Sequence, residues 1–430
     1  MAVADVKISG AEALVARHPA PASAAKWANE ARDGAMARLR AMGAPMRRDE
    51  YWRFTNPAIL NADAPRHATA LVTDETPVFD GFDALRIVFV DGVFDAAQSS
   101  DLSGEPHLSV EHLTDALATD IHWAKDVFGV LEAAGQTPVD RPFAALNTAV
   151  AQSGVVIRAT GPVSRPVNLR YLHVAEDADA VIHHVIKVDD SATLTILENG
   201  PAAARFNKAM EIMVGDGAEF HHVRAQGRDH DRQCVSHMFA RVGKEALYKS
   251  FTLTVNGVLT RNEHVIDMQG DDASAHVAGA CVGEGDFHHD DTVFVTHDAE
   301  RCESRQVFKK VLKSGAVGVF QGKILVKEGA QKTDGYQISQ GLLLDDDAQF
   351  LAKPELEIYA DDVACSHGST CGAADETALF YLLSRGIPRA QAENMLVLAF
   401  LGEAMDEIAD DDLAEEMRGR VAGWLERHSK

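Results

Sequence analysis

Long apolar runs are missing from this sequence. No stretch approaches the roughly 18 uncharged residues that a membrane-spanning helix requires. Near the start, Asp5, Lys7 and Glu12 interrupt the apolar region that a secretory signal peptide would need. Both absences predict a cytoplasmic protein that does not enter the membrane.

Positive charge is also scarce. Lysine and arginine number 41 against 65 aspartate and glutamate residues, which gives a formal net charge of -24. Proteins that bind nucleic acid or anionic membranes use clustered lysine and arginine. No long basic run occurs here, so neither nucleic acid nor a membrane surface is an expected partner.

Cysteine is rare, with five residues in 430. Their odd number and wide spacing do not resemble the disulfide framework of a secreted domain, so we expect reduced thiols. They are Cys234, Cys281, Cys302, Cys365 and Cys371. We expect the first three to lie in the core, because free cysteine commonly behaves as a small buried hydrophobe.

Motifs of common enzyme classes are absent as well. The sequence contains no CxxC pair, G-x-S-x-G elbow or H-E-x-x-H helix. The nearest approach to a phosphate-binding loop, residues 318–324, has the wrong glycine spacing and no hydroxyl residue after Lys323. We therefore expect neither ATP hydrolysis nor ordinary hydrolytic or redox catalysis.

Helix is predicted at the beginning of the chain, in a domain covering residues 1–77. Gly10 to Arg40 is rich in alanine, which favours helix, and Pro19 and Pro21 separate two helices. The aromatic segment 51–54 is expected to pack this domain onto its neighbour. Residues 61–77 have the polar, proline-containing composition of a linker.

Strands dominate the next part, residues 78–368. The first is Leu85–Val90, closed by the hairpin turn Asp91-Gly92. A helical interlude is expected near residues 110–134. Its apolar side would carry Leu113, Leu117, Ile121, Val127 and Leu131.

A repeat follows from Gly154 onward, where short alternating strands come after turns that end in alanine. These alanines are Ala192, Ala218, Ala246, Ala273 and Ala299. Their spacing of 26 to 28 residues is in the range of solenoids. Looser turns at residues 314–316, 328–330 and 346–348 continue the pattern. Because no helix intervenes between the strands, we predict a mainly β protein built on a right-handed parallel β-helix, with helical domains before and after it.

The stretch from Lys353 to Gly386 contains the residues best suited to chemistry. Leu356, Ile358 and Ala360 alternate with polar residues, as on a half-buried strand. Cys365 and His367 lie two residues apart, which on a strand places a thiol and an imidazole on one face. Both side chains are ligands for transition metals, so this strand is a candidate metal site.

Three helices are predicted in the last part, residues 369–430. Asp375 is the expected N-cap of the first, Gly386 and Pro388 separate it from the second, and the third begins near Asp411. Their apolar positions include Leu379, Leu382, Ala392, Met395, Leu398, Ala399, Leu401, Met405, Leu413, Met417, Val421, Trp424 and Leu425. Such broad stripes serve either packing within the chain or docking of a partner.

Several stretches together resemble the SufB/SufD family of iron–sulfur cluster assembly proteins. KPELEIYADDV at 353–363, CSHG at 365–368 and LFYLLSRGI at 379–387 are similar to the family's C-terminal motif. Residues 43–55 and 143–147 resemble its N-terminal helical segment and the lead-in to its central domain. The CSHG form is similar to the SufD branch. Ala364 and Cys371 depart from the family pattern, which usually has a lysine and an aliphatic residue there.

The resemblance implies a β-helix between two helical domains and a role as a non-catalytic scaffold subunit of a SufBCD complex. It implies that His367 faces a cysteine of a SufB-like paralogue across an interface where a transient iron–sulfur cluster forms, with no permanently bound cofactor. It also implies that the C-terminal helices dock a SufC-like ATPase. The expected partner-binding residues are Leu379, Leu382, Leu398, Leu401 and Met405.

Other residues leave alternatives open. Cys365 and Cys371 are either further metal ligands or packing residues. Some complexes of the family are associated with reduced flavin, but the sequence has no dinucleotide fingerprint. Adjacent strand residues point to opposite faces, so only one histidine of each pair 183–184, 221–222 and 288–289 can join a ladder across coils.

Two other functions fit parts of the pattern. One is an exported β-helix enzyme acting on carbohydrate, with Asp271, Asp272, Asp290 and Asp291 as acid or cation-binding groups. The other is a stand-alone homodimeric metal-binding scaffold.

Overall fold

A computed structural model describes residues 3–19, 21, 24–70, 76–102, 104–200, 202–227 and 231–428. Part of the predicted linker, residues 71–75, lies outside these ranges. The helices are α1 (Val3–Ala16), α2 (Lys26–Met42), η1 (Glu50–Trp52), α3 (Ala58–Asn61), α4 (Leu113–Ala118), η2 (Trp123–Asp126), α5 (Val130–Ala134), α6 (Pro142–Val150), α7 (Glu376–Ser384), α8 (Arg389–Met405) and α9 (Asp411–His428).

Strands fill the long middle section. They are β1 (Leu85–Val90), β2 (Val93–Asp95), β3 (Leu108–His112), β4 (Val155–Ala159), β5 (Val167–Leu172), β6 (Asp179–Val188), β7 (Thr193–Asn199), β8 (Arg205–Val214), β9 (Glu219–Gly227), β10 (Gln233–Val242), β11 (Leu247–Val255), β12 (Leu259–Met268), β13 (Ser274–Glu284), β14 (His288–His297), β15 (Glu303–Lys313), β16 (Val317–Val326), β17 (Asp334–Leu343), β18 (Gln349–Ile358) and β19 (Ala364–Gly372). The predicted hairpin of β1 and β2 is confirmed.

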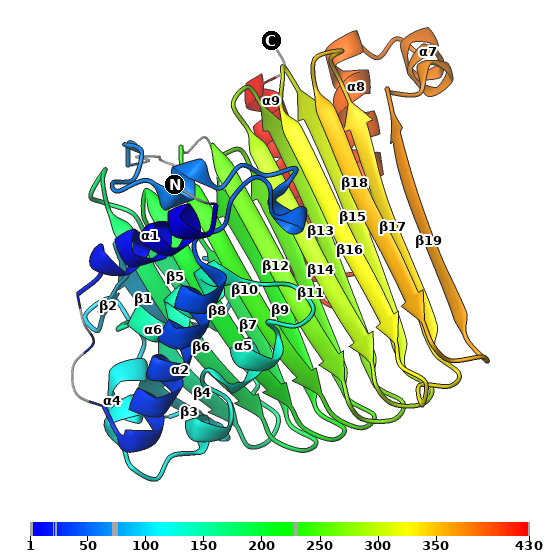
Figure 1. Ribbon diagram of the computed structural model, residues 1–430. Helices are drawn as coiled ribbons and strands as arrows, with labels where there is room; N and C mark the ends of the chain where they lie inside the picture. Colours follow the sequence, from blue (N-terminus) through cyan, green and yellow to red (C-terminus); the bar gives the residue numbers. More distant parts are fainter. Residues whose placement is uncertain are drawn as a thin grey trace.

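The strands form two facing sheets that the chain visits alternately. One sheet has the order β19-β17-β15-β13-β11-β9-β7-β5-β1-β2, and the other has the order β18-β16-β14-β12-β10-β8-β6-β4-β3. From β4 onward every pairing between successive coils is parallel. The predicted parallel β-helix is therefore confirmed, with about seven turns (Figure 1).

Alternation along each strand divides side chains between the space inside the two sheets, which we call the lumen, and the outer faces. Apolar residues of both sheets meet in the lumen and form the largest core cluster, which includes Ile196, Met210, Phe220 and Tyr248. Cys234, Cys281 and Cys302 are buried in core clusters, as predicted.

The alanines of the predicted repeat mark corners of the coils, but the register between strands shows that they do not all share one corner. Backbone hydrogen bonds join Ala192, Ala218, Ala246 and Ala273 in one column and continue it to residue 302, a cysteine. Ala299 therefore lies outside the column, and that coil has 29 residues. Ala316 and Ala348 precede strands of the other sheet and lie at the opposite corner.

N-terminal helices cover the outer face of the β18-to-β3 sheet. There α6 contacts β6 and β8, and the ring of Tyr51 packs edge-on against Phe294. The packing role predicted for segment 51–54 is confirmed for Tyr51 and Trp52, which are buried. The interlude begins with strand β3 and not helix, and the expected apolar residue Ile121 is 91% exposed. Helix α6, which is wholly buried, was not predicted.

C-terminal helices α8 and α9 cover the outer face of the other sheet over β13 and β15 (Figure 1). The predicted apolar side of α9 is buried. In α8 the prediction is partly wrong, because Met395 and Ala399 are exposed while Val397 and Ala404 are buried. Among the described residues, no helix is long and apolar enough to cross a membrane.

The two ends of the solenoid differ. At one end, the outermost described strands β2 and β3 pair antiparallel with β1 and β4, and we call this the closed end. At the other end, β18 and β19 are the outermost described strands of their sheets. We call the end formed by β18 and β19 the open end.

Candidate functional site

The open end carries the predicted metal ligands. Strand β19 pairs with β17 in parallel register and extends to Gly372, four residues past the predicted end of the β-helix. Cys365, His367 and Cys371 share its lumen-facing side, because they lie opposite lumen-facing residues of β17 and are separated by even numbers of residues. His367 and Cys371 are exposed and Cys365 is half-buried, so all three positions can be approached at the open end.

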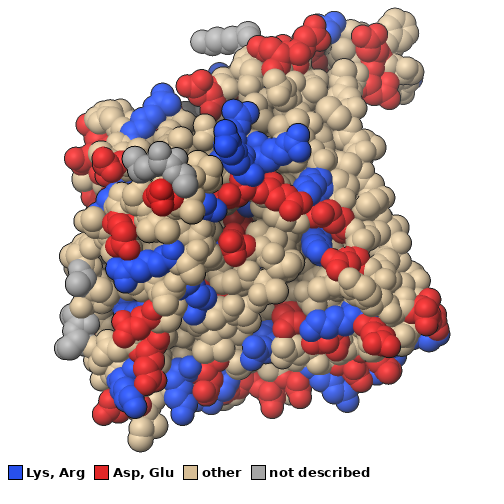
Figure 2. Space-filling view, in the orientation of Figure 1, with Lys and Arg blue, Asp and Glu red and all other residues tan. Residues whose placement is uncertain are grey.

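Strand β19 lacks the usual protection of an edge. Exposed edge strands normally carry charges or proline that discourage pairing with another chain. The sequence of β19, ACSHGSTCG, contains neither, whereas β18 has Lys353, Pro354 and Glu355. In Figure 2, the right-hand side of the molecule, where β17 and β19 lie in Figure 1, is largely free of charged side chains between the helices above and the turns below.

Two glutamines lie beneath His367 in the lumen. Gln337 is the register partner of His367, and Gln306 is that of Gln337, so the three residues form a column across β15, β17 and β19. Both amides are fully buried, and neither has a hydrogen-bond partner in the described part of the chain. Buried amides without partners are uncommon and costly. Sequence reasoning missed this pair, since only the inter-strand register places it below the histidine.

The two thiols at the open end are kept in their neutral form. Partial burial raises the pKa of Cys365 and of Cys371 above that of a free thiol. A metal ion would have to displace these protons in order to bind the sulfur atoms. Within the described ranges no group of three histidine, cysteine or carboxylate side chains is arranged to hold a metal ion.

The expected partner-binding residues differ in burial. Leu401 and Met405 are completely buried and belong to the cluster that packs α8 on its own sheet, and Leu379 is buried too. Leu382 and Leu398 are half-buried. The large exposed apolar residues of α7 and α8 are instead Phe380, Tyr381 and Met395. Helix α7 lies beyond the sheets in Figure 1.

The histidine pairs do not form a ladder. His184 and His289 face the lumen from β6 and β14, but they belong to different register columns. His222 faces it from β9, where its Nε2 lies 2.8 Å from Oε2 of Glu198. His184 and His222 both join the hydrogen-bond network of Tyr171 and Glu198, whereas His289 lies 2.8 Å from the Lys310 ammonium.

The four aspartates considered for a carbohydrate enzyme do not form one site. Asp271 and Asp272 lie in an exposed turn and are paired with Arg301. Asp290 is buried against Arg261 on the outer face, and Asp291 pairs with Lys310 in the lumen. Each carboxylate is thus paired with a cation of this chain, and Asp271 and Asp272 share one.

Comparison with known proteins agrees with this fold and with the motif on β18, β19 and α7. The family model described as "SUF system FeS cluster assembly, SufBD core domain" matches residues 171–400, more than half of the chain. The chain belongs to the SufB/SufD family. Within it, the similarity points to the SufD branch.

Relatives in the SufB/SufD family match most of the chain. The iron–sulfur cluster assembly protein SufD of Escherichia coli is 26% identical over 411 residues, covering 91% of each chain. A SufBD family protein of Synechocystis is also 26% identical over 411 residues, covering 91% of this chain and 90% of the relative. SufD of Bacillus subtilis is 26% identical over 281 residues, or 64% of each chain.

Proposed function

We propose that this chain is a SufD-type iron–sulfur cluster assembly protein that acts in the cytoplasm as a non-catalytic scaffold. In this proposal it pairs with a SufB-like paralogue through the open end and binds a SufC-like ATPase through α7 and α8. Membership of the SufB/SufD family and the similarity to SufD proteins over 91% of the chain support it.

The observation that carries the proposal is the difference between the two ends of the solenoid. One end is closed by antiparallel strands. The other presents an uncharged edge strand, β19, with unpaired backbone groups. Because an unprotected edge readily pairs with another strand, we expect a second chain to cover it. A related β-helix offers edges of matching twist and spacing.

The chemistry of the edge fits the assembly of a cluster between two chains. Iron in clusters is held by thiolates and, in some sites, by imidazole. Cys365, His367 and Cys371 supply up to three such donors on one side of one strand. The remaining ligands would come from the paralogue, so formation of the complex would control when the site is complete. His367 is the donor that we assign to this chain.

Buried Gln337 supports the assignment of His367. As the register partner of the histidine, it places an amide without other partners next to the imidazole. A hydrogen bond between them would select one imidazole tautomer and orient the ring.

The test is reconstitution with the SufB-like and SufC-like partners. We expect His367→Ala to leave the purified complex intact and to reduce cluster formation at least tenfold, measured as iron and sulfide content and by visible absorbance. His67→Ala removes an exposed histidine that lies far from His367 in the sequence and pairs with Glu176, and this variant should assemble clusters normally.

The outcomes separate the proposal from its alternatives. Unchanged cluster content in His367→Ala would remove this residue from assembly. If the chain binds neither partner and instead forms a stable homodimer with iron, the stand-alone scaffold replaces the present proposal.

A further inference from the structure

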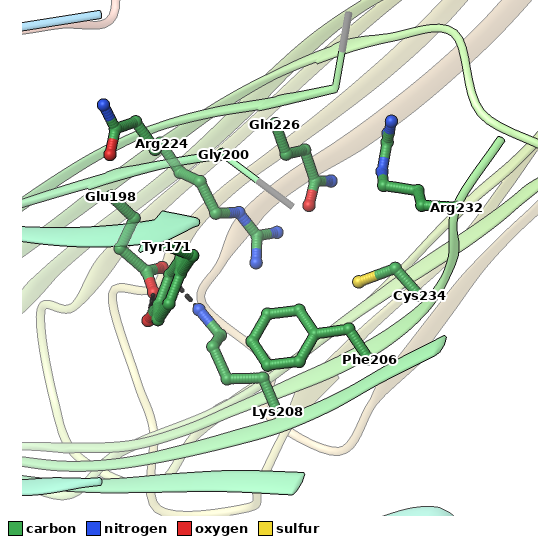
Figure 3. Close-up of a pocket in the computed structure, with 10 residues that line it drawn as sticks. Tyr171, Glu198, Gly200, Phe206, Lys208, Arg224, Gln226, Arg232 and Cys234 are labelled. Carbon is green, nitrogen blue, oxygen red and sulfur yellow. Dashed lines mark hydrogen bonds and ion pairs between the residues drawn. The ribbon is translucent and has the colours of Figure 1, made fainter. Parts of the chain in front are cut away.

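A cluster of charged side chains fills the lumen near the closed end, far from the strand β19. Side chains from five strands and from the residue before β10 surround a small cavity there (Figure 3). Its volume is about 10 Å³, which is room for about one water molecule. The lining residues used below are Glu198, Lys208, Arg224, Arg232 and Cys234.

Positive charge is in excess around this cavity. Lys208, Arg224 and Arg232 are buried with a single carboxylate, that of Glu198. Burial alone would raise the pKa of Glu198, but the Lys208 ammonium and the His222 ring hold it well below its usual value, so the group is ionised. Burial lowers the pKa of Lys208 only to about 8 and that of His222 to about 4. At neutral pH three cations therefore face one anion.

Both oxygens of the Glu198 carboxylate already have hydrogen-bond partners other than the two arginines. Glu198 accepts hydrogen bonds from the Tyr171 hydroxyl at 2.6 Å and from the Lys208 ammonium, and it lies 2.8 Å from Nε2 of His222. It makes no ion pair with either arginine in the described structure. The excess charge is thus located on Arg224 and Arg232.

Within the described ranges, both guanidinium groups donate hydrogen bonds to neutral acceptors only. Arg224 donates to Oγ of Ser236 at 3.0 Å and to Oδ1 of Asn262 at 2.8 Å. Arg232 donates to Oγ1 of Thr260 at 3.1 Å and makes a long contact of 3.5 Å with the carbonyl of Val255. The Nε atom of each arginine has no partner among the described residues.

The fold holds Arg232 in place. Its guanidinium lies so close to Gly227 that a Cβ there would be 2.1 Å from Nη1, and it is about 3.0 Å from the equivalent position at Gly257. Both glycines have positive φ angles, 83° and 122°, which other residues rarely adopt. A buried cation without a counter-ion is strongly unfavourable. Arg232 has no carboxylate partner among the described residues, yet it is packed in a slot shaped for it.

We propose that this cavity binds a small monovalent anion, of the size of chloride or hydrosulfide, between Arg224, Arg232 and the thiol of Cys234. The volume excludes phosphate and sulfate. Figure 3 shows the Arg224 guanidinium and the Cys234 sulfur directed toward the same space, with Arg232 beside it. Burial raises the pKa of Cys234, so the sulfur carries a proton and acts as a weak donor to the anion. The inference does not depend on the proposed function.

The first experiment uses crystals of the full chain grown or soaked in sodium bromide. We expect an anomalous peak in the cavity, within contact distance of Arg224 and Arg232. Crystals in sodium gluconate, whose anion is too large to enter, should show none. An empty or water-filled cavity in bromide would overturn the proposal, and this result requires no variant to fold.

The second experiment measures the thermal midpoint in chloride and in gluconate at equal ionic strength. We expect the midpoint to rise with chloride concentration and Arg232→Met to weaken the apparent chloride affinity at least tenfold. Arg158→Met removes an arginine paired with Asp189 outside the lumen. The thermal midpoint of this variant should still rise with chloride concentration. Identical midpoints of the unmodified chain in chloride and gluconate would contradict the proposal.

A parallel titration with sodium hydrosulfide, without oxygen and at the same ionic strength, distinguishes chloride from hydrosulfide as the bound anion. Stabilisation at concentrations at least tenfold below those of chloride would identify the ligand as hydrosulfide, the protonated form of the sulfide in iron–sulfur clusters. Equal effects would identify a general halide-type site.

Discussion

At the scale of residues, charged groups are buried on both sides of the sheets, and on the outer side they compensate one another. Beneath the N-terminal helices, Glu263 joins two arginines: its Oε2 lies 2.9 Å from Nε of Arg141 and its Oε1 lies 2.7 Å from Nε of Arg261. Arg261 also pairs with Asp290, which accepts a hydrogen bond from Thr55. This network attaches the aromatic segment to the solenoid.

The pKa of Glu263 makes this network testable. Burial alone would raise that pKa, but the charges of Arg261, His237 and Arg141 outweigh it and lower it to about 2. The folded pKa is below the unfolded value, so the stabilisation is complete above pH 4.5 and is lost as pH falls toward 2. It amounts to about 3 kcal/mol.

Glu263→Gln should therefore lower the free energy of unfolding at pH 7 by roughly 3 to 5 kcal/mol, because it leaves two arginines without their shared carboxylate. Urea unfolding of both proteins from pH 7 to pH 3 checks this. The difference between them should shrink below pH 4.5, and a constant difference would show that Glu263 does not titrate as described.

The chemistry of individual residues could be predicted only where it depends on residues close together in the sequence. Cys365 and His367 share a face because strand alternation has a period of two, and the sequence shows that directly. Gln337 is separated from His367 by one coil and Gln306 by two. No pattern within a few residues indicates that their amides lie below the imidazole.

At the scale of elements, α8 shows how packing selects among apolar residues. The stripe predicted for it included Met395, which is 43% exposed, and omitted Val397, which is buried. Almost every side of this helix offers an apolar residue. The sheet beneath it decides which side is covered.

Leu401→Ala should reduce the free energy of unfolding by roughly 2 to 5 kcal/mol, since it leaves a cavity between α8 and the sheet. Met395→Ala, on the exposed side, should change it by no more than about 0.5 kcal/mol. Chemical denaturation of the two variants compares them. If Met395→Ala lowered the free energy of unfolding as much as Leu401→Ala, α8 would be packed on a different side.

Phe380→Asp tests the proposed docking surface on α7. Phe380 is 71% exposed, so the change should leave stability within about 0.5 kcal/mol while weakening binding of the SufC-like ATPase at least tenfold. Calorimetric titration measures the affinity. Ile121→Asp places the same charge on an exposed apolar residue elsewhere and should bind normally. Equal binding by both variants would move the docking site away from α7.

At the scale of the whole molecule, the solenoid has one closed end and one open end. Repetition of coils buries each apolar face on its neighbour, so the last coil is left with two edges, on β18 and β19, that no described strand pairs with. The uncharged sequence of β19 suits a permanent or regulated partner better than solvent.

Lysine at both Ser366 and Thr370, exposed positions on β19, should prevent pairing with the SufB-like paralogue by making the edge charged. The fold should persist, because neither side chain is buried. Light scattering after size-exclusion chromatography of the mixed proteins measures the complex. Lysine at Val93 and Ala96, exposed at the closed end, is the matched control. A complex of normal size with the β19 variant would place the interface elsewhere.

The sequence by itself determined the local features of this protein: helices at both ends, alternating strands between them, corners spaced as in a solenoid, and a thiol and an imidazole on one face of the last strand. These follow from alternation, capping and spacing, which depend on residues close together in the chain. Only the tertiary structure decided which alanines share a corner, which side of α8 is buried, that three cations and one carboxylate line the same small cavity in the lumen, and that two buried glutamine amides lie below His367. The physical reason is the register between coils. Side chains about 26 to 32 residues apart become neighbours there, and a shift of one residue would turn each of them to the opposite face.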